Sequence, residues 1–320
     1  SPIARTLNDG LPFDGVCPTA GTVVEGLEGG TDEGDVLVSI APASDGRQLI
    51  WEGFPGANGE TTVYLFYYDR TGANEASKQP LLELFEQYFQ SLPSYRKPGV
   101  GFRHVRPVFG YIPARHGRTG RIAARGLLCL GDSAAGQSPL TFCGFGSFVR
   151  HVGRASMLIS YVLEHNLLEE KHLRQISSHQ PNLRVAWVFS RFMQPWPGSD
   201  VYAVNRLMNV FSHALSDLGP VITRRFLQDR YTFGEYVRIM LTTARHYPRV
   251  FTITARALGA FGLAGWASDI TRFGASDLLR MLSMNVPRRS RTRLRRLIQK
   301  TSPQLALRLL AAETMWQATR

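Results

Sequence analysis

The sequence GDSAAGQSPLTFCGFG, at residues 131–146, is the most informative stretch of the chain. It follows an apolar run at residues 127–130, which predicts a short buried strand. It also opens a pattern of apolar residues at three- and four-residue spacing, which predicts an amphipathic helix at residues 145–163. A carboxylate at the end of a strand, here Asp132, makes strong charge-assisted hydrogen bonds to hydroxyl groups. Glycines that open a helix leave backbone N–H groups facing an electron-rich ligand. The stretch therefore predicts either a ligand-binding loop or an ordinary strand-to-helix turn with an Asp cap.

Upstream of this stretch the sequence has the pattern of β-strands, and downstream it has helical periodicity. Runs of β-branched and aromatic residues predict strands at residues 22–24, 35–40, 48–51, 61–68 and 105–111, with one helix among them at 81–92. Beyond about residue 167 nearly every segment is helix-periodic, with breaks at prolines. The predicted fold class is mixed α+β. We expect three consecutive parts: a β-rich substrate-binding domain at 1–115, the strand–loop–helix at 116–165 and a helical region at 166–320.

Composition excludes several classes of protein. Of the 320 residues, 44% are hydrophobic and 19% charged, which is typical of a globular chain. The three cysteines form no CxxC or Cys/His cluster, so we expect a reducing compartment, no disulfide framework and no metal site. No run of 18 uninterrupted apolar residues occurs, which predicts that no helix spans a bilayer.

The stretch at 131–146 resembles the second FAD motif of the para-hydroxybenzoate-hydroxylase-type flavoproteins. More narrowly, QSPLTFCGFGSFVRH at 137–151 resembles the Cru-type lycopene cyclases. Shorter matches to that group occur in the family's order, so the resemblance covers residues 1 to about 235. These shorter matches are SPI at 1–3, DGVC at 14–17, WEGFP at 51–55, QPNL at 180–183 and FLQD at 226–229.

The resemblance implies that the chain uses FAD, in its reduced form, to act on a carotenoid or another long isoprenoid. Asp132 would bond the ribityl chain, and the backbone at the start of the helix would face the pyrimidine edge of the flavin. Cys143 stands where the family usually has glycine. The implied cofactor-binding residues are Gly131, Asp132, Pro139, Gly144, Phe145 and Gly146.

In the resembled family a GxGxxG unit that binds adenine lies upstream of the SPI match. This sequence contains no such unit opening a βαβ element. We therefore expect that the chain begins after that unit and that by itself it binds FAD weakly.

Glu52 is the candidate catalytic acid. Cyclisation of this kind begins when a proton adds to an end-group double bond and forms a carbocation. It therefore needs a carboxylic acid in an apolar, aromatic setting, which raises its pKa and stabilises the cation. Strand alternation alone also explains Glu52, as a solvent-facing side chain. The other predicted members of the substrate pocket are Trp51, Phe54, Tyr64, Phe66 and Tyr68.

Three functions are compatible with these features. The first is a lycopene cyclase-like enzyme. The second is a flavin-dependent redox enzyme on the same scaffold, such as a hydroxylase, an epoxide-handling enzyme or a prenyl reductase. The third is a non-catalytic flavoprotein paralogue. The sequence does not decide among them, nor does it decide the oligomeric state.

The positive charge of the chain lies in its second half. Residues 1–130 hold 12 Lys/Arg and 14 Asp/Glu, whereas residues 131–320 hold 25 and 11. The tract at 287–300 follows an apolar stretch and carries no acidic residue, which predicts a helix in an anionic membrane interface. No nucleic acid is expected, because the tract lacks interleaved aromatic residues. We expect a peripheral membrane protein, on the bacterial cytoplasmic face or in a plastid. The predicted membrane-facing residues are Arg288, Arg289, Arg291, Arg293, Arg295 and Arg296.

Overall fold

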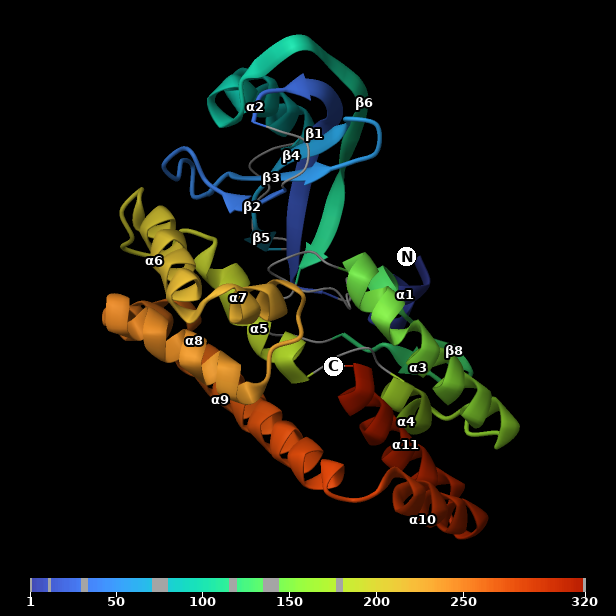
Figure 1. The fold of residues 1–320 in the computed structure, drawn as a ribbon. Coiled ribbons are helices and arrows are strands. Elements are labelled where there is room, and N and C mark those ends of the chain that lie inside the picture. The colour runs from blue at the N-terminus through green and yellow to red at the C-terminus, as the bar shows by residue number, and fades with distance from the viewer. Residues whose placement is uncertain are drawn as a thin grey trace. The chain divides into compact units, whose positions relative to one another are not determined.

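The computed structural model describes residues 2–10, 13–29, 34–70, 80–114, 120–134, 144–176 and 181–318 (Figure 1). The chain forms two compact units. The sheet unit comprises Phe13–His116 and Phe189–Val210, and the helical unit comprises Ser1–Pro12, Gly117–Val188 and Phe211–Arg320. The predicted mixed α+β fold class is confirmed, because an antiparallel sheet and a large set of helices occupy different parts of the chain.

The sheet unit contains an antiparallel sheet in the order β2-β3-β4-β1-β5, with β6 also paired to β1. Each strand predicted upstream of residue 115 is present. The strands are β1 (Gly15–Leu27), β2 (Asp35–Val38), β3 (Ile50–Pro55), β4 (Thr61–Phe66), β5 (Asp69–Arg70) and β6 (Pro98–Ala114).

One face of this sheet is covered by α2 (Pro80–Tyr95), the helix predicted at 81–92. Leu84, Tyr88 and Leu92 recur at three- and four-residue steps on the helix and are buried against the strands. Trp51 lies under the helix, with its ring centroid 4.7 Å from that of Tyr95 in a stacked arrangement. The core of the sheet unit therefore lies between α2 and this face.

The helical unit holds the remaining elements. Thr232 and Glu235 form a capping box that starts α8, and Pro220 occupies the first turn of α7, so local rules begin both helices. The helices are α1 (Pro2–Leu7), α3 (Gly144–Glu164), α4 (Glu170–Leu173), α7 (Pro220–Leu227), α8 (Phe233–His246), α9 (Val250–Met284), α10 (Arg288–Thr301) and α11 (Pro303–Ala318). Two more, α5 (Pro181–Phe192) and α6 (Ala203–Leu218), run from one unit into the other.

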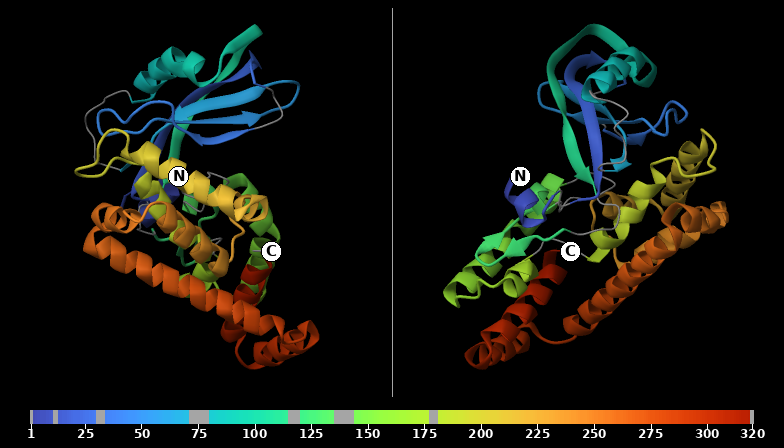
Figure 2. Two further views of the ribbon diagram at one scale, coloured as in Figure 1. Left: turned by 60° about the vertical axis from the view of Figure 1, so that its left-hand side comes forward. Right: turned by 180° about the vertical axis from the view of Figure 1, so that it is seen from behind.

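The long amphipathic helix predicted at 145–163 is present as α3, and it packs against α11. Figure 2 shows α10 and α11 as a helical pair at one end of this unit. The guanidinium of Arg154 in α3 is buried and donates to the backbone carbonyls of Ile176 at 3.1 Å, Gln175 at 3.0 Å and Ala311 at 3.4 Å. These bonds pair the charged group with backbone carbonyls and connect α3 to the turn at Gln175 and Ile176 and to α11.

The domain boundaries differ from the three consecutive parts that we predicted. The strand–loop–helix belongs to the same unit as the C-terminal helices, because α3 packs on α11. Residues 1–12 join this unit as well, since Ala4 of α1 is buried against Cys129 and Ala134. The predicted strand at 127–130 is reduced to β8 (Leu127–Leu128), which pairs only with β7 (Ala123–Ala124).

The prediction that no helix could span a bilayer is wrong by length and composition, because Val250–Ser283 is long and apolar enough. We required an uninterrupted apolar run, whereas α9 is rich in Gly, Ala and Thr with few charges. Gly259, at φ 63° and ψ 179°, breaks the helical conformation within it.

We expect Leu158→Ala to lower the free energy of unfolding by about 2–5 kcal/mol, because Leu158 is fully buried between α3 and its neighbours. Leu163→Ala, on the same helix but 61% exposed, is the matched control and should change stability by less than about 0.5 kcal/mol. Urea unfolding, monitored by circular dichroism, measures the free energy of unfolding of both variants. Equal effects would contradict the packing of α3 described above.

Candidate functional site

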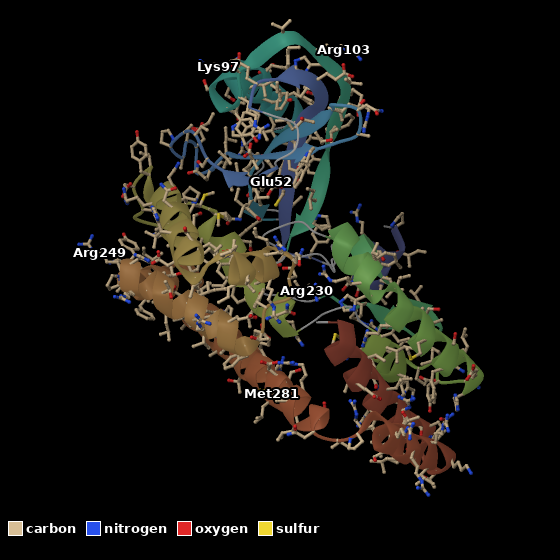
Figure 3. All side chains as sticks on the ribbon, viewed as in Figure 1. Glu52, Lys97, Arg103, Arg230, Arg249 and Met281 are labelled. Atoms are coloured by element: carbon tan, nitrogen blue, oxygen red, sulfur yellow. The ribbon has the colours of Figure 1, made fainter. Side chains whose placement is uncertain are left out.

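Glu52 lies in β3, directly opposite Tyr64 of β4, and none of its surface is exposed (Figure 3). The hydroxyl of Tyr64 donates a hydrogen bond to Oε2 of Glu52, with 2.5 Å between the oxygens. The other carboxyl oxygen, Oε1, is also buried and accepts no hydrogen bond from the described residues. The alternative that Glu52 is a solvent-facing residue is therefore wrong.

Burial changes the acidity of this carboxyl group. Desolvation raises the pKa of Glu52 to about 8, while the Tyr64 hydroxyl and, less strongly, the backbone of Leu37 act in the opposite direction. At neutral pH Glu52 is therefore mostly protonated. A neutral, desolvated acid can donate a proton to a group that has no other polar partner.

A β-bulge lies opposite Glu52. Asp35 of β2 pairs with Gly53 and Val38 pairs with Trp51, so two residues of β2 face the single residue Glu52. One of these two, Leu37, has φ 60°, a left-handed conformation that costs a non-glycine residue about 1–2 kcal/mol. Strained backbone of this kind is concentrated at functional sites. No local pattern in the sequence indicated this bulge.

Aromatic rings extend from Glu52 along its face of the sheet. The rings of Phe54, Tyr64, Phe66 and Tyr68 follow one another with centroid separations of 5.8, 6.0 and 5.7 Å. Four predicted pocket residues thus lie together on one face. Aromatic faces at these spacings can stabilise a cation.

Cys17 is a further titratable group near this cluster. Burial raises the pKa of Cys17 and of Tyr68, and the charge of Glu52 adds to both shifts. A free, fully buried thiol is therefore neutral in this setting. We had not predicted Cys17 as part of the site, although its position in the strand next to β4 follows from the pairing of β1.

Trp51 does not belong to the same face as Glu52, which corrects the prediction that it lines the pocket. Successive residues of a strand point to opposite faces, so Trp51 points toward α2 when Glu52 points away from it. Its ring packs against Tyr88 and Tyr95 and is almost completely buried. Trp51 is a residue of the sheet unit's core.

The segment Phe189–Val210 belongs to the sheet unit. The side-chain amide of Asn205 donates to Ser39 Oγ at 2.9 Å and to the carbonyl of Ala41 at 3.1 Å, just beyond β2. Arg191 lies close enough to Arg70 of β5 for their charges to interact, which adds to the effect of burial in lowering the pKa of Arg191.

The predicted flavin-binding stretch is described only in part. Gly131 has φ 58° and begins a 3₁₀ turn, Gly131–Ala134. Gly144, Phe145 and Gly146 form the first turn of α3, so their backbone N–H groups include those that a helix leaves unpaired. The side chain of Asp132 and all of Pro139 and Cys143 lie outside the described residues.

His151, the last residue of the stretch 137–151 that carries the resemblance, is a packing residue of the helical unit. It is buried, and desolvation together with the nearby Arg154 and Arg150 lowers its pKa to about 4. Among the described residues no group of three or more His, Cys, Asp or Glu side chains is arranged to hold a metal ion. The predicted lack of a metal site stays a prediction.

The basic tract forms α10, and its arginines divide between two sides. Arg291 and Arg295 are partly buried and form ion pairs with Glu313 of α11, at 3.6 and 2.9 Å. This corrects their prediction as membrane-facing residues, because an acidic partner on the next helix turns them inward. Arg289, Arg293 and Arg296 are exposed, and the side chain of Arg288 lies outside the described residues.

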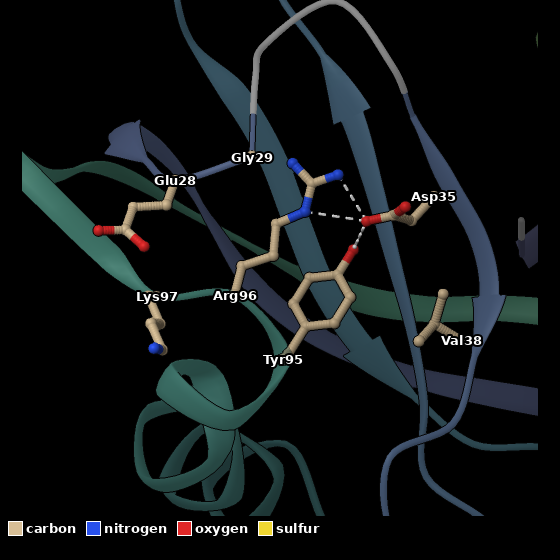
Figure 4. Close-up of a pocket in the computed structure, with 7 residues that line it drawn as sticks. All are labelled: Glu28, Gly29, Asp35, Val38, Tyr95, Arg96 and Lys97. Carbon is tan, nitrogen blue, oxygen red and sulfur yellow. Dashed lines mark hydrogen bonds and ion pairs between the residues drawn. The ribbon is translucent and has the colours of Figure 1, made fainter.

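A pocket of about 460 Å³ lies at the end of α2, on the sheet unit (Figure 4). The carboxylate of Asp35 accepts hydrogen bonds from the Tyr95 hydroxyl at 2.7 Å and from Arg96 Nε at 2.9 Å. Both donors are therefore already engaged within the protein. These contacts join β2, which carries the bulge opposite Glu52, to the end of α2, and we assign them a structural role.

The chain matches no known family model, and a search of the curated proteins finds no relative. The assignment of function therefore depends on the Glu52 site and on the motif resemblance.

We expect Glu52→Gln to stabilise the chain increasingly as the pH rises. The pKa of Glu52 is higher in the folded than in the unfolded state, so the stability that it contributes below pH 4.5 is lost as the pH rises to about 8. The side chain of Gln does not ionise, so the variant does not lose stability in this way. The variant should therefore gain, relative to the parent, on the order of 4–5 kcal/mol between these two pH values.

Urea unfolding at both pH values measures this difference. Glu86→Gln, at an exposed position of α2, is the control and should show no comparable trend. A pH-independent difference between parent and Glu52→Gln would mean that Glu52 is ionised in the folded chain.

Proposed function

We propose that the chain is part of an FAD-dependent, lycopene cyclase-like enzyme that closes rings on a long apolar isoprenoid by proton transfer. The observation that carries the proposal is Glu52: a fully buried carboxyl group with a pKa of about 8, bonded to Tyr64 beside a row of aromatic rings. An alkene has no polar group to guide it, so an acid that protonates it must be neutral and desolvated beforehand.

The chemistry balances without an oxidant. The O–H bond of Glu52 breaks and its proton forms a C–H bond at one carbon of the terminal double bond, which leaves a cation on the other. The π electrons of the next double bond close the ring on this cation. The new cation then loses a proton from a neighbouring carbon, and the Glu52 carboxylate takes that proton back. The rings of Phe66 and Tyr68 would face the cationic intermediates.

FAD fits the described residues in part. The left-handed Gly131 and the unpaired N–H groups at the start of α3 are features that a flavin site uses. The strand before Asp132 is only two residues long, so this segment supplies a turn and a helix terminus rather than a complete cradle. When bound, reduced FAD would supply negative charge that stabilises a carbocation.

In a host that accumulates linear carotenoids, the complete gene product should convert end groups to rings, and Glu52→Gln should abolish this activity. Gln preserves the shape of the side chain but donates no acidic proton. Chromatography of the extracted pigments with mass spectrometry measures the outcome, with Glu86→Gln as the active control. Products that differ in oxygen content or saturation would instead support the redox alternative, and cyclisation by Glu52→Gln would exclude Glu52 as the acid.

Flavin binding is tested separately. The complete gene product should purify with bound FAD, and Asp132→Ala should lose it, since the carboxylate is the predicted partner of the ribityl chain. The control is Ser133→Ala, which removes only an internal hydrogen bond to the carbonyl of Leu130. Flavin absorbance per protein measures occupancy. Full occupancy in Asp132→Ala would refute the assignment of this motif.

A further inference from the structure

The outer side of α10 combines positive charge with apolar side chains. Arg289, Arg293, Arg296 and Lys300 recur at three- and four-residue steps and are exposed. Among the described residues no acidic side chain pairs with any of these four, in contrast to the inward-facing arginines that contact Glu313. Leu294 and Leu297 lie beside this basic row and are 56% and 59% exposed.

The last turns of α9 and the residues that lead from it to α10 are apolar and exposed. Leu278, Leu282 and Val286 follow at four-residue steps and are 53%, 56% and 43% exposed. Leu279 and Met281 flank the row and are also exposed. Met281 is labelled in Figure 3. A short connection leads from these residues into α10 (Figure 1).

The opposite side of α9 holds the helix to its own unit. Phe273 is buried in contact with Tyr236 of α8. Asp277 accepts a hydrogen bond from the backbone N–H of Phe233 at 3.1 Å. Asp269 accepts one from the indole of Trp187 at 3.3 Å. A helix that used these contacts could not also be surrounded by lipid, so α9 lies along the protein rather than across a bilayer.

We propose that the outer side of α10 and the last turns of α9 form a docking surface for an anionic phospholipid membrane. The basic row fits phosphate head groups, and the neighbouring leucines fit the acyl boundary just beneath them. A nucleic acid would satisfy the charges but would leave the leucines in water, and the described part of this surface presents no aromatic platform for bases. The proposal does not depend on the chemistry of Glu52.

The structure supplies a pair of variants with the same change in charge. Arg293→Gln with Arg296→Gln removes two outward charges, and Arg291→Gln with Arg295→Gln removes the two that face Glu313. The full chain should sediment with phosphatidylcholine vesicles only when they contain phosphatidylglycerol. Binding should weaken as salt rises, because exposed charges are screened beyond about 8 Å at physiological ionic strength.

The variant without the outward charges of Arg293 and Arg296 should lose vesicle affinity about 30-fold, because each basic residue near an anionic surface contributes about fivefold to the affinity. The variant without the inward charges of Arg291 and Arg295 should lose at most about fivefold in vesicle affinity. Circular dichroism and thermal unfolding must show that both variants are folded. An alkaline wash should release the bound parent from the vesicles.

Three results would overturn the proposal. The first is an equal loss in both pairs, which would indicate attraction by net charge alone. The second is resistance to the alkaline wash, which would indicate a membrane-spanning helix. The third is tight binding of a single-stranded RNA probe without any vesicle binding.

Discussion

Antiparallel pairing of β1 with β4 on one side and β6 on the other assigns the side chains of these strands to one of two faces. Gly21 is the position at which this pairing is most restrictive. It lies opposite Tyr64, and a Cβ atom there would come 2.1 Å from the carbonyl oxygen of Val63. Only glycine permits the strands to approach so closely. This close approach fixes the position of Tyr64, whose hydroxyl donates a hydrogen bond to Glu52.

The two faces have different physical roles. The face toward α2 is an ordinary apolar core, in which Trp51, Leu65 and Tyr88 exclude water and stabilise the unit. The other face buries Glu52, the thiol of Cys17 and the hydroxyl of Tyr68, and buried polar groups lower stability unless they are paired. The left-handed Leu37 adds a conformational cost at the same place. A protein retains such costs where they serve function, which is why this face is the candidate site.

The helical unit follows a comparable division between inner and outer surfaces. On α10 a single acidic residue of the next helix, Glu313, distinguishes two arginines that stabilise the packing from those that face solvent. On α9 the buried Phe273 and the bonded Asp269 and Asp277 lie on the side opposite the exposed leucines. The exposed basic residues of α10 thus lie on the side of that helix that does not contact Glu313.

The sequence by itself determined the fold class, the upstream strands, α2 and α3, because two-residue alternation and helical spacing are local patterns. It also singled out Glu52 as an acid among aromatic residues. Only the tertiary structure decided that Glu52 is buried, that Trp51 lies on the opposite face and that Cys17 is nearby. It alone revealed the bulge at Leu37 and the pairing of Arg291 and Arg295 with Glu313. The physical reason is that burial and pKa depend on neighbours from distant parts of the chain, whose register and orientation no local pattern specifies.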